Sequence, residues 1–162
     1  MTLYVTHFCY TFLNIKGENI MKLVNKYIIN KTSFYWIVLV ISIIFYSISF
    51  MLPALLLKES YLLGQYVFKM GWYGIFVLNF AWYANPIYYF SIIAYLKKNF
   101  TSARNRAFIS LIFGSFSFIT NDWYSGGNVL HIVEGVGIGF YIWMVSFFII
   151  FIGSLILKNK EN

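Results

Sequence analysis

Four long apolar runs, separated by short polar or charged segments, make up most of the chain. Three of them contain no charged residue at all. As a helix, the run 71–96 would cover about 39 Å at about 1.5 Å per residue, and the hydrocarbon core of a bilayer is about 30 Å thick. The pattern therefore predicts four membrane-spanning helices, at 34–57, 71–96, 107–124 and 135–157.

The fold class that this pattern predicts is an all-α membrane protein, a bundle of four transmembrane helices. Residues 1–33 are expected to form a basic tail, 34–157 a single transmembrane domain and 158–162 a short second tail. Met21 begins a stretch with three lysines that leads into the first apolar run, which is typical of a natural start. We therefore expect residues 1–20 to lie outside the native chain or to form a loosely held tail.

Composition and charge favour a membrane location. The chain is 60% hydrophobic and 10% charged, whereas about a quarter of the residues in typical soluble domains are charged. In a soluble protein a net charge of +7 would suggest a nucleic-acid partner, but here the basic residues gather in short clusters between apolar runs. We expect the lipid bilayer as the partner, and no nucleic acid. The single cysteine, Cys9, excludes a disulfide framework within the chain.

The distribution of Lys and Arg predicts the orientation. Four of the twelve basic residues precede the first run, four lie in 97–106 and two follow the last run, whereas two lie in 58–70 and none in 121–134. With four spans, ten of the twelve fall on one side of the membrane. Cytoplasmic loops carry the excess of Lys and Arg, so both termini are expected in the cytoplasm.

Five residues of the second run form a candidate intramembrane polar site: Asn79, Trp82, Asn85, Pro86 and Tyr89. Most of them recur at three- and four-residue steps and would share one helix face. Pro86 removes the hydrogen bond to the carbonyl of Trp82 and predicts a bend there. One interpretation is a kinked helix whose polar face is held against its neighbours by hydrogen bonds. The other is a substrate or ion site near the membrane midplane, built where the helix is broken.

Three titratable residues near the predicted outer face form a second candidate site: Asp122, His131 and Glu134. His131 and Glu134 are three residues apart and would share the face of a helix. The turn-forming stretch 125–128, SGGN, would bring Asp122 towards them. A metal site normally needs three or four ligands, and the alternative interpretation is helix capping and solvation. We expect neither a metal nor a cofactor.

Gly135 and Gly139, at the start of the last run, have the GxxxG spacing that lets two helices approach closely. Small residues are needed at such a crossing because larger side chains would hold the backbones apart. The spacing predicts helix packing within the monomer, with dimerisation as the alternative.

Two groups of residues carry a resemblance to a known kind of protein. They are Gly71-Trp72 followed by Ala81-Trp82-Tyr83-Ala84-Asn85-Pro86, and Gly139-Phe140-Tyr141-x-Trp143-x-x-Ser146. This pattern, over about the last 90 residues, resembles a group of short multi-pass bacterial membrane proteins without assigned activity. The resemblance implies a multi-pass protein of the bacterial inner membrane and supplies no catalytic residue.

No arrangement of residues typical of a nucleophile, a general acid and base or a phosphate-binding loop occurs in the sequence, so we do not expect an enzyme. The first hypothesis is a non-enzymatic accessory, regulatory or structural membrane module, as a homo-oligomer or with a membrane protein partner. The second is a small transporter or channel component that uses the helix break at Asn79, Asn85 and Pro86. The third is an immunity protein against a pore-forming bacteriocin. An enzyme acting at the outer face through the Asp122, His131 and Glu134 group is the least favoured.

Overall fold

The computed structural model describes residues 31–77, 79–124 and 130–159. The chain forms two compact units, Met1–Phe34 and Tyr35–Asn162, and the description below concerns the second. The predicted tail at 1–20, the SGGN stretch and the last three residues lie outside the described part.

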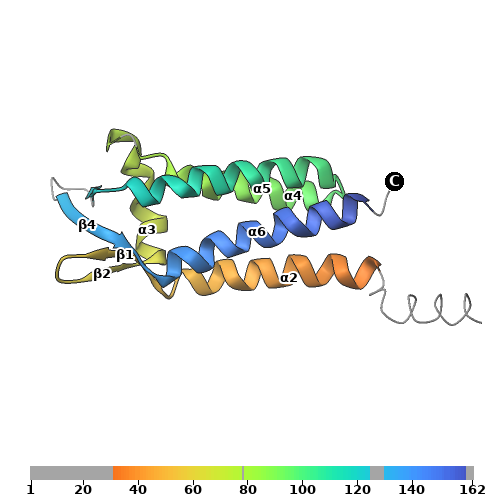
Figure 1. The fold of residues 1–162 in the computed structure, drawn as a ribbon, viewed down its shortest axis with the longest axis horizontal. Coiled ribbons are helices and arrows are strands. Elements are labelled where there is room, and N and C mark those ends of the chain that lie inside the picture. Colours follow the sequence, from red (N-terminus) through yellow and green to blue (C-terminus); the bar gives the residue numbers. More distant parts are fainter. Residues whose placement is uncertain (1–30, 78, 125–129, 160–162) are drawn as a thin grey trace, which may run out of the picture. The chain divides into compact units, whose positions relative to one another are not determined.

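Four helices run along one another in a bundle (Figure 1): α2 (Lys31–Ser49), α4 (Ala84–Leu96), α5 (Phe100–Ser115) and α6 (Ile138–Asn159). α5 packs against both α4 and α6. Each falls within or beside one of the four apolar runs, so the predominantly helical class is confirmed. The predicted bounds are wrong at most helix ends, because the residues there form strands, turns or 3₁₀ helices.

The second predicted span, 71–96, is not one helix. It consists of the 3₁₀ helix η1 (Gly71–Val77), an irregular step, the short 3₁₀ helix η2 (Ala81–Tyr83) and then α4. The side chain of Asn79 accepts a hydrogen bond from the backbone N–H of Ala81 at 3.0 Å, in place of a helical carbonyl. Pro86 therefore lies in the first turn of α4, where its missing N–H costs little, and the mid-helix bend predicted at Pro86 is a helix start.

A four-stranded antiparallel sheet stands at one end of the bundle (Figure 1), and the sequence patterns did not predict it. Its strands are β1 (Pro53–Leu57), β2 (Tyr61–Leu63), β3 (Asp122–Tyr124) and β4 (Leu130–Val136), in the order β2-β1-β4-β3. Three predicted spans are therefore partly wrong. The end of the first span is strand β1, the end of the third is strand β3, and the beginning of the last belongs to strand β4.

The inner face of this sheet has a small core of its own. Leu55, Trp123 and Val133 are buried together, and the short helix α3 (Gly64–Met70) contributes Val67 and Met70 to the same cluster. Residues 58–70, which separate the first two apolar runs, therefore contain a strand followed by a helix. The bulky apolar residues of Pro53–Leu57 serve a strand well, since they can be buried on one side of the sheet.

The turn between α4 and α5 closes α4 in a Schellman motif. The N–H of Asn99 donates to the carbonyl of Ala94 (2.9 Å), and the N–H of Lys98 donates to that of Tyr95 (2.8 Å). Lys98 has a φ of 58°, the left-handed conformation in which glycine is usual, and a side chain there costs on the order of 1 kcal/mol. Asn99 then caps α5 by accepting from the N–H of Ser102 (3.0 Å). As a result α5 begins at Phe100 and not at the predicted 107.

Small residues make up most of the buried face of α5. On α5 they recur at steps of four, three and four residues and are all buried: Ala103, Ala107, Ser110 and Gly114. A side chain at Gly114 would meet Met144 of α6, and one at Gly153 of α6 would meet Val38 of α2. These small residues let the helices approach closely, as in bundles within lipid.

By length and composition, one helix among the described residues can cross a membrane alone, and it is α6 over Ile138–Lys158. Ser33–Ser49 is a shorter apolar helix. α4 and α5 are shorter still. The α-helices themselves therefore do not meet the prediction of four full-length spans.

Candidate functional site

The side-chain amide of Asn85 joins three helices of the bundle. Its oxygen accepts hydrogen bonds from the hydroxyl of Tyr46 on α2 (2.8 Å) and from the indole N–H of Trp143 on α6 (3.0 Å). Its nitrogen donates to the carbonyl of Trp82 (2.9 Å), which is the carbonyl that Pro86 leaves without a donor. Asn85 is 5% exposed, so these bonds form largely away from water.

A second polar connection lies deeper in the bundle. Ser42 of α2 contacts the hydroxyl of Tyr88 on α4 and donates to the carbonyl of Ser146 on α6 (2.7 Å). A serine hydroxyl has one hydrogen, so Tyr88 is the donor in the first of these bonds. Ser42, Tyr88 and Ser146 have no exposed surface, and the rings of Tyr46 and Tyr88 stack with centroids 5.0 Å apart. These two connections, joined by the stacked rings of Tyr46 and Tyr88, are called the polar centre of the bundle below.

A cavity of about 70 Å³, lined in part by Asn85, lies where the bundle meets the sheet. Six of its lining residues are aromatic: Phe50, Phe68, Trp82, Trp123, Phe140 and Trp143. It is far smaller than the pockets of about 300–1,000 Å³ that hold cofactors or drug-sized ligands. A space of this size suits a few water molecules or one small group.

The polar residues at the cavity are mostly engaged with the protein itself. Asn79 donates to the hydroxyl of Thr120, and the indole N–H of Trp82 donates to the carbonyl of Phe68 (2.7 Å). Trp123 differs, since its indole nitrogen is one of two buried side-chain polar atoms in the described part of the chain that have no partner. Leaving a buried donor unpaired costs about 1–3 kcal/mol.

The predicted polar site is therefore divided. Asn79, Trp82 and Asn85 line the cavity, whereas Pro86 and Tyr89 do not. Tyr89 is 42% exposed on the outside of the bundle. The five residues do not share a helix face, because Asn79 and Trp82 precede α4.

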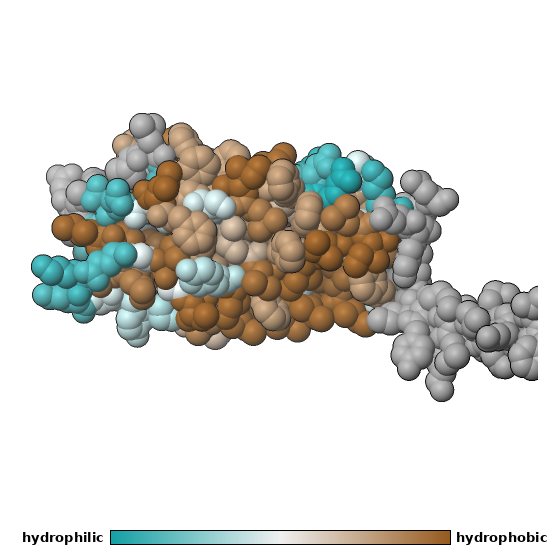
Figure 2. All heavy atoms as spheres, in the orientation of Figure 1, coloured by the Kyte–Doolittle hydropathy of each residue, from teal (hydrophilic) through white to brown (hydrophobic). Residues whose placement is uncertain are grey.

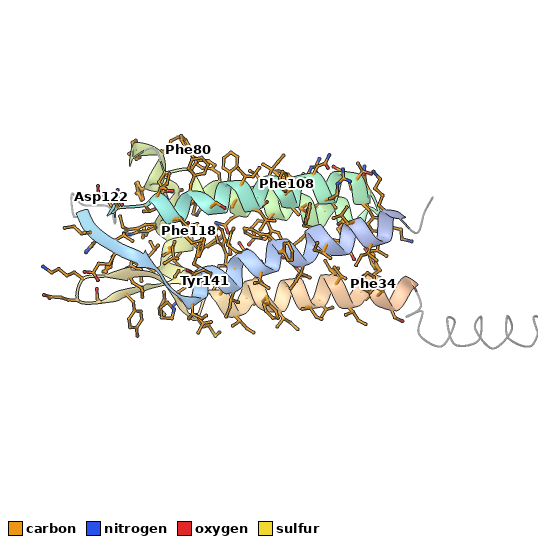
Figure 3. All side chains as sticks on the ribbon, in the orientation of Figure 1. Phe34, Phe80, Phe108, Phe118, Asp122 and Tyr141 are labelled. Carbon is orange, nitrogen blue, oxygen red and sulfur yellow. The ribbon has the colours of Figure 1, made fainter. Side chains whose placement is uncertain are left out.

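The residues of the predicted outer cluster lie in two paired strands and not at helix ends. β3 pairs with β4 so that Trp123 is opposite His131 and Asp122 is opposite Ile132. The three-residue spacing of His131 and Glu134 would place them on one face of a helix, but they lie in strand β4, so this basis for the cluster is wrong. Figure 3 places Asp122 at the sheet end of the molecule. Within the described ranges no group of three His, Cys, Asp or Glu residues could hold a metal ion.

The GxxxG prediction is wrong because the two glycines do not lie on one helix: Gly135 lies in β4, and of the two only Gly139 is helical. A side chain at Gly135 would meet nothing within 4 Å. A side chain at Gly139 would come within 2.8 Å of the carbonyls of Leu52 and Pro53, and one at Gly137 would strike the Pro53 carbonyl. Gly137 and Gly139 therefore allow the start of α6 to lie against β1.

The sequence analysis missed several residues of the polar centre, namely Ser42, Tyr46, Tyr88, Trp143 and Ser146. A signal was available: a serine or tyrosine inside a charge-free run has no partner in lipid and needs one on its own helix or on a neighbouring helix. Comparisons with protein-family models, with curated proteins and with solved structures found no match for the chain.

Proposed function

We propose that this chain is a multi-pass integral membrane protein, and that it works as a non-enzymatic accessory, regulatory or structural module. The observation that carries the proposal is the distribution of polarity in the bundle. Among the residues that the structure describes, five serines are completely buried: Ser42, Ser91, Ser110, Ser146 and Ser154. Large apolar side chains cover the outside of the same helices, including Trp36, Ile44, Phe90, Phe108 and Phe148. Water would favour the opposite arrangement, whereas lipid favours this one.

The surface supports the same interpretation. In Figure 2 a hydrophobic surface covers the length of the helices, and hydrophilic residues gather near the two ends. Only 39% of the apolar window of α6 is buried inside the protein, whereas the core helix of a water-soluble domain would be mostly buried. Contiguous apolar surface on this scale marks a membrane or protein contact.

The shorter helices reach further when their 3₁₀ extensions are included. α5 continues into η3 (Phe116–Ile119), and together they rise about 32 Å. η2 and α4 together rise about 26 Å. A bilayer of about 30 Å accommodates such lengths by tilt or local thinning, at a modest cost.

The charges support an orientation with the sheet outside the cytoplasm. Five basic residues with described side chains lie at the end of the bundle away from the sheet: Lys97, Lys98, Arg104, Arg106 and Lys158. The three carboxylates of the described part lie at the sheet end: Glu59, Asp122 and Glu134. The excess of positive charge favours the cytoplasm for the first end. Both termini are then cytoplasmic, as in a bacterial inner-membrane protein.

The outer end has features of a membrane interface and of a contact surface. α3 lies across the end of the bundle (Figure 1), and exposed aromatic residues follow along this segment at Tyr66, Trp72 and Phe76. Aromatic side chains of this kind are enriched at headgroup level. The sheet beyond exposes Tyr61 and Ile132, which suits contact with a membrane protein partner or a second copy of the chain.

The orientation is tested by reporter proteins fused after Asn162. Green fluorescence from this fusion is expected, because the fluorescent protein folds in the cytoplasm. Alkaline phosphatase fused at the same place should be inactive, because it requires export. Active phosphatase together with a dark fluorescent fusion would overturn the orientation.

One observation favours a second candidate, a small transporter or channel component. The cavity lies beside the helix start at Asn79 and Asn85, where a broken helix could offer polar groups to a solute. Ion flux into proteoliposomes is the test, with Asn85→Ala and the exposed Asn105→Ala compared at equal protein incorporation. Flux above that of empty liposomes, lost only in Asn85→Ala, would establish it in place of the structural module.

A further inference from the structure

We propose that the basic end of the bundle binds the headgroup of an anionic phospholipid. The site consists of Lys97 and Lys98 in the turn between α4 and α5, Arg104 and Arg106 in the first two turns of α5, and Lys158 in the last turn of α6. The inference rests on the proposed membrane location and adds a specific lipid class to it.

The charges of this site are not neutralised by the described part of the protein. The guanidinium of Arg104 donates to the side-chain oxygen of Asn105 at 3.1 and 2.9 Å. That of Arg106 donates to the backbone carbonyl of Phe90 at 2.9 Å. Both acceptors are neutral, and an arginine has five N–H donors, so donors and positive charge remain for a phosphate.

The position of Lys98 is a second observation. It holds the left-handed C′ position of a Schellman motif, which glycine fills at no steric cost. A residue kept in an unfavourable backbone conformation suggests that its side chain has a use. Here the motif fixes two adjacent lysines, both exposed, at the rim of the apolar surface.

The ligand must also have an apolar part. Phe90 and Ile93 of α4 and Phe108 of α5 are exposed next to the basic residues along the same two helices. Figure 2 shows the hydrophilic patch at this end bordered directly by hydrophobic surface. A negatively charged headgroup with acyl chains matches both parts, whereas free phosphate matches only the first.

The test measures the midpoint of thermal unfolding of the full chain in mixed micelles of lipid and an uncharged detergent. Phosphatidylglycerol should raise the midpoint in a saturable way. Phosphatidylcholine and inorganic phosphate, at the same concentrations, should not. The effect should weaken as sodium chloride is raised, because exposed charges are screened.

The double variant Lys97→Ala, Lys98→Gly separates lipid binding from folding. Glycine relieves the strained backbone, so the midpoint without lipid should stay the same or rise by a few degrees. The affinity for phosphatidylglycerol should fall roughly 30-fold, as expected for two cations at about 1 kcal/mol each. The matched control is Lys58→Ala, Lys69→Ala at the sheet end, which should keep the affinity within about twofold.

Equal stabilisation by phosphatidylcholine, or by inorganic phosphate, would overturn the lipid site while leaving the membrane proposal intact. An equal loss of affinity in the Lys58/Lys69 control would also overturn it, because binding would then follow net charge alone. Failure of the wild-type chain to enter phosphatidylcholine vesicles would overturn the membrane location, and the lipid site with it.

Discussion

The side-chain oxygen of Asn85 accepts a hydrogen bond from the indole N–H of Trp143 at 3.0 Å, although the two residues are 58 positions apart in the sequence. The bond joins the start of α4 to α6, and the Tyr46 hydroxyl adds α2 at the same oxygen. One amide therefore holds three helices at the level where the bundle meets the sheet.

Replacing Asn85 by Ala should destabilise the protein by roughly 1–4 kcal/mol. The change removes two bonds between helices, each worth about 0.6–2 kcal/mol, and leaves the indole N–H of Trp143 and the hydroxyl of Tyr46 without their acceptor. Unfolding in detergent, followed by circular dichroism, measures the loss. The control is Asn105→Ala, because Asn105 is exposed and bonds only to Arg104; it should change the stability by less than about 0.5 kcal/mol. Equal effects of the two variants would contradict the role assigned to Asn85.

Ser42 and Tyr88 should be energetically coupled. Tyr88→Phe removes the hydroxyl that donates to Ser42, and Ser42→Ala leaves the buried Tyr88 hydroxyl without its acceptor, so either change alone removes the bond. A double-mutant cycle should give a coupling energy of about 0.5–1.5 kcal/mol. The control cycle pairs Tyr88→Phe with Ser47→Ala, because Ser47 is an exposed serine of α2, the helix that carries Ser42. It should give no coupling energy. Strictly additive Ser42 and Tyr88 effects would rule out the bond as a stabilising contact.

Gly137→Ala should destabilise the protein, whereas Gly135→Ala should be tolerated. A Cβ atom at Gly137 would strike the backbone carbonyl of Pro53, and backbone cannot move aside as a flexible side chain can. Overpacking of this kind typically costs about 1–3 kcal/mol. A Cβ at Gly135 meets only open space. The unfolding midpoints of the two variants decide the matter, and the reverse order would favour a GxxxG helix contact through Gly135.

Introducing a lysine at two neighbouring residues of β4 should affect the stability of the protein very differently. Ile132 is 67% exposed and Val133 is buried with Leu55 and Trp123. Ile132→Lys should therefore change the stability by less than about 0.5 kcal/mol, and Val133→Lys should cost several kcal/mol and open the sheet. Amide hydrogen exchange at residues 54–57 of β1, the strand beside β4, reports the opening. Equal exchange rates in the two variants would contradict the assignment of β4 as a strand with Val133 buried and Ile132 exposed.

The helical class could be predicted from the sequence because lipid-like apolar runs constrain the backbone strongly. A helix satisfies its own backbone groups, and the long charge-free run 138–157 forms one. Asn79 and Asn85 were conspicuous in the sequence as amides in apolar surroundings. Their positions relative to one another were not predicted, because one continuous helix was assumed over 71–96.

The sheet could not be predicted from apolar runs, and the reason is visible in its strands. Pro53–Leu57 reads PALLL and continues the first apolar run without a break, so hydropathy cannot separate helix from strand there. Pro53 was the available signal, because proline often marks the end of a helix. The pairing of β1 with β4 joins segments about 80 residues apart, and short local patterns do not encode such a contact.

The central claim is that lipid surrounds the bundle, and labelling of single cysteines at three depths tests it most directly. With Cys9 replaced by Ser, cysteine is placed at Lys58 beside the sheet, at Phe108 in the middle of α5 (Figure 3) and at Lys97 in the turn after α4. A membrane-impermeant maleimide is applied to bacterial cells before and after permeabilisation. The account predicts labelling of Lys58→Cys in intact cells, of Lys97→Cys only after permeabilisation, and of Phe108→Cys under neither condition. Phe108 is 51% exposed on the surface of the protein, so rapid labelling of that cysteine in the folded chain would show that water surrounds the bundle and would contradict the account.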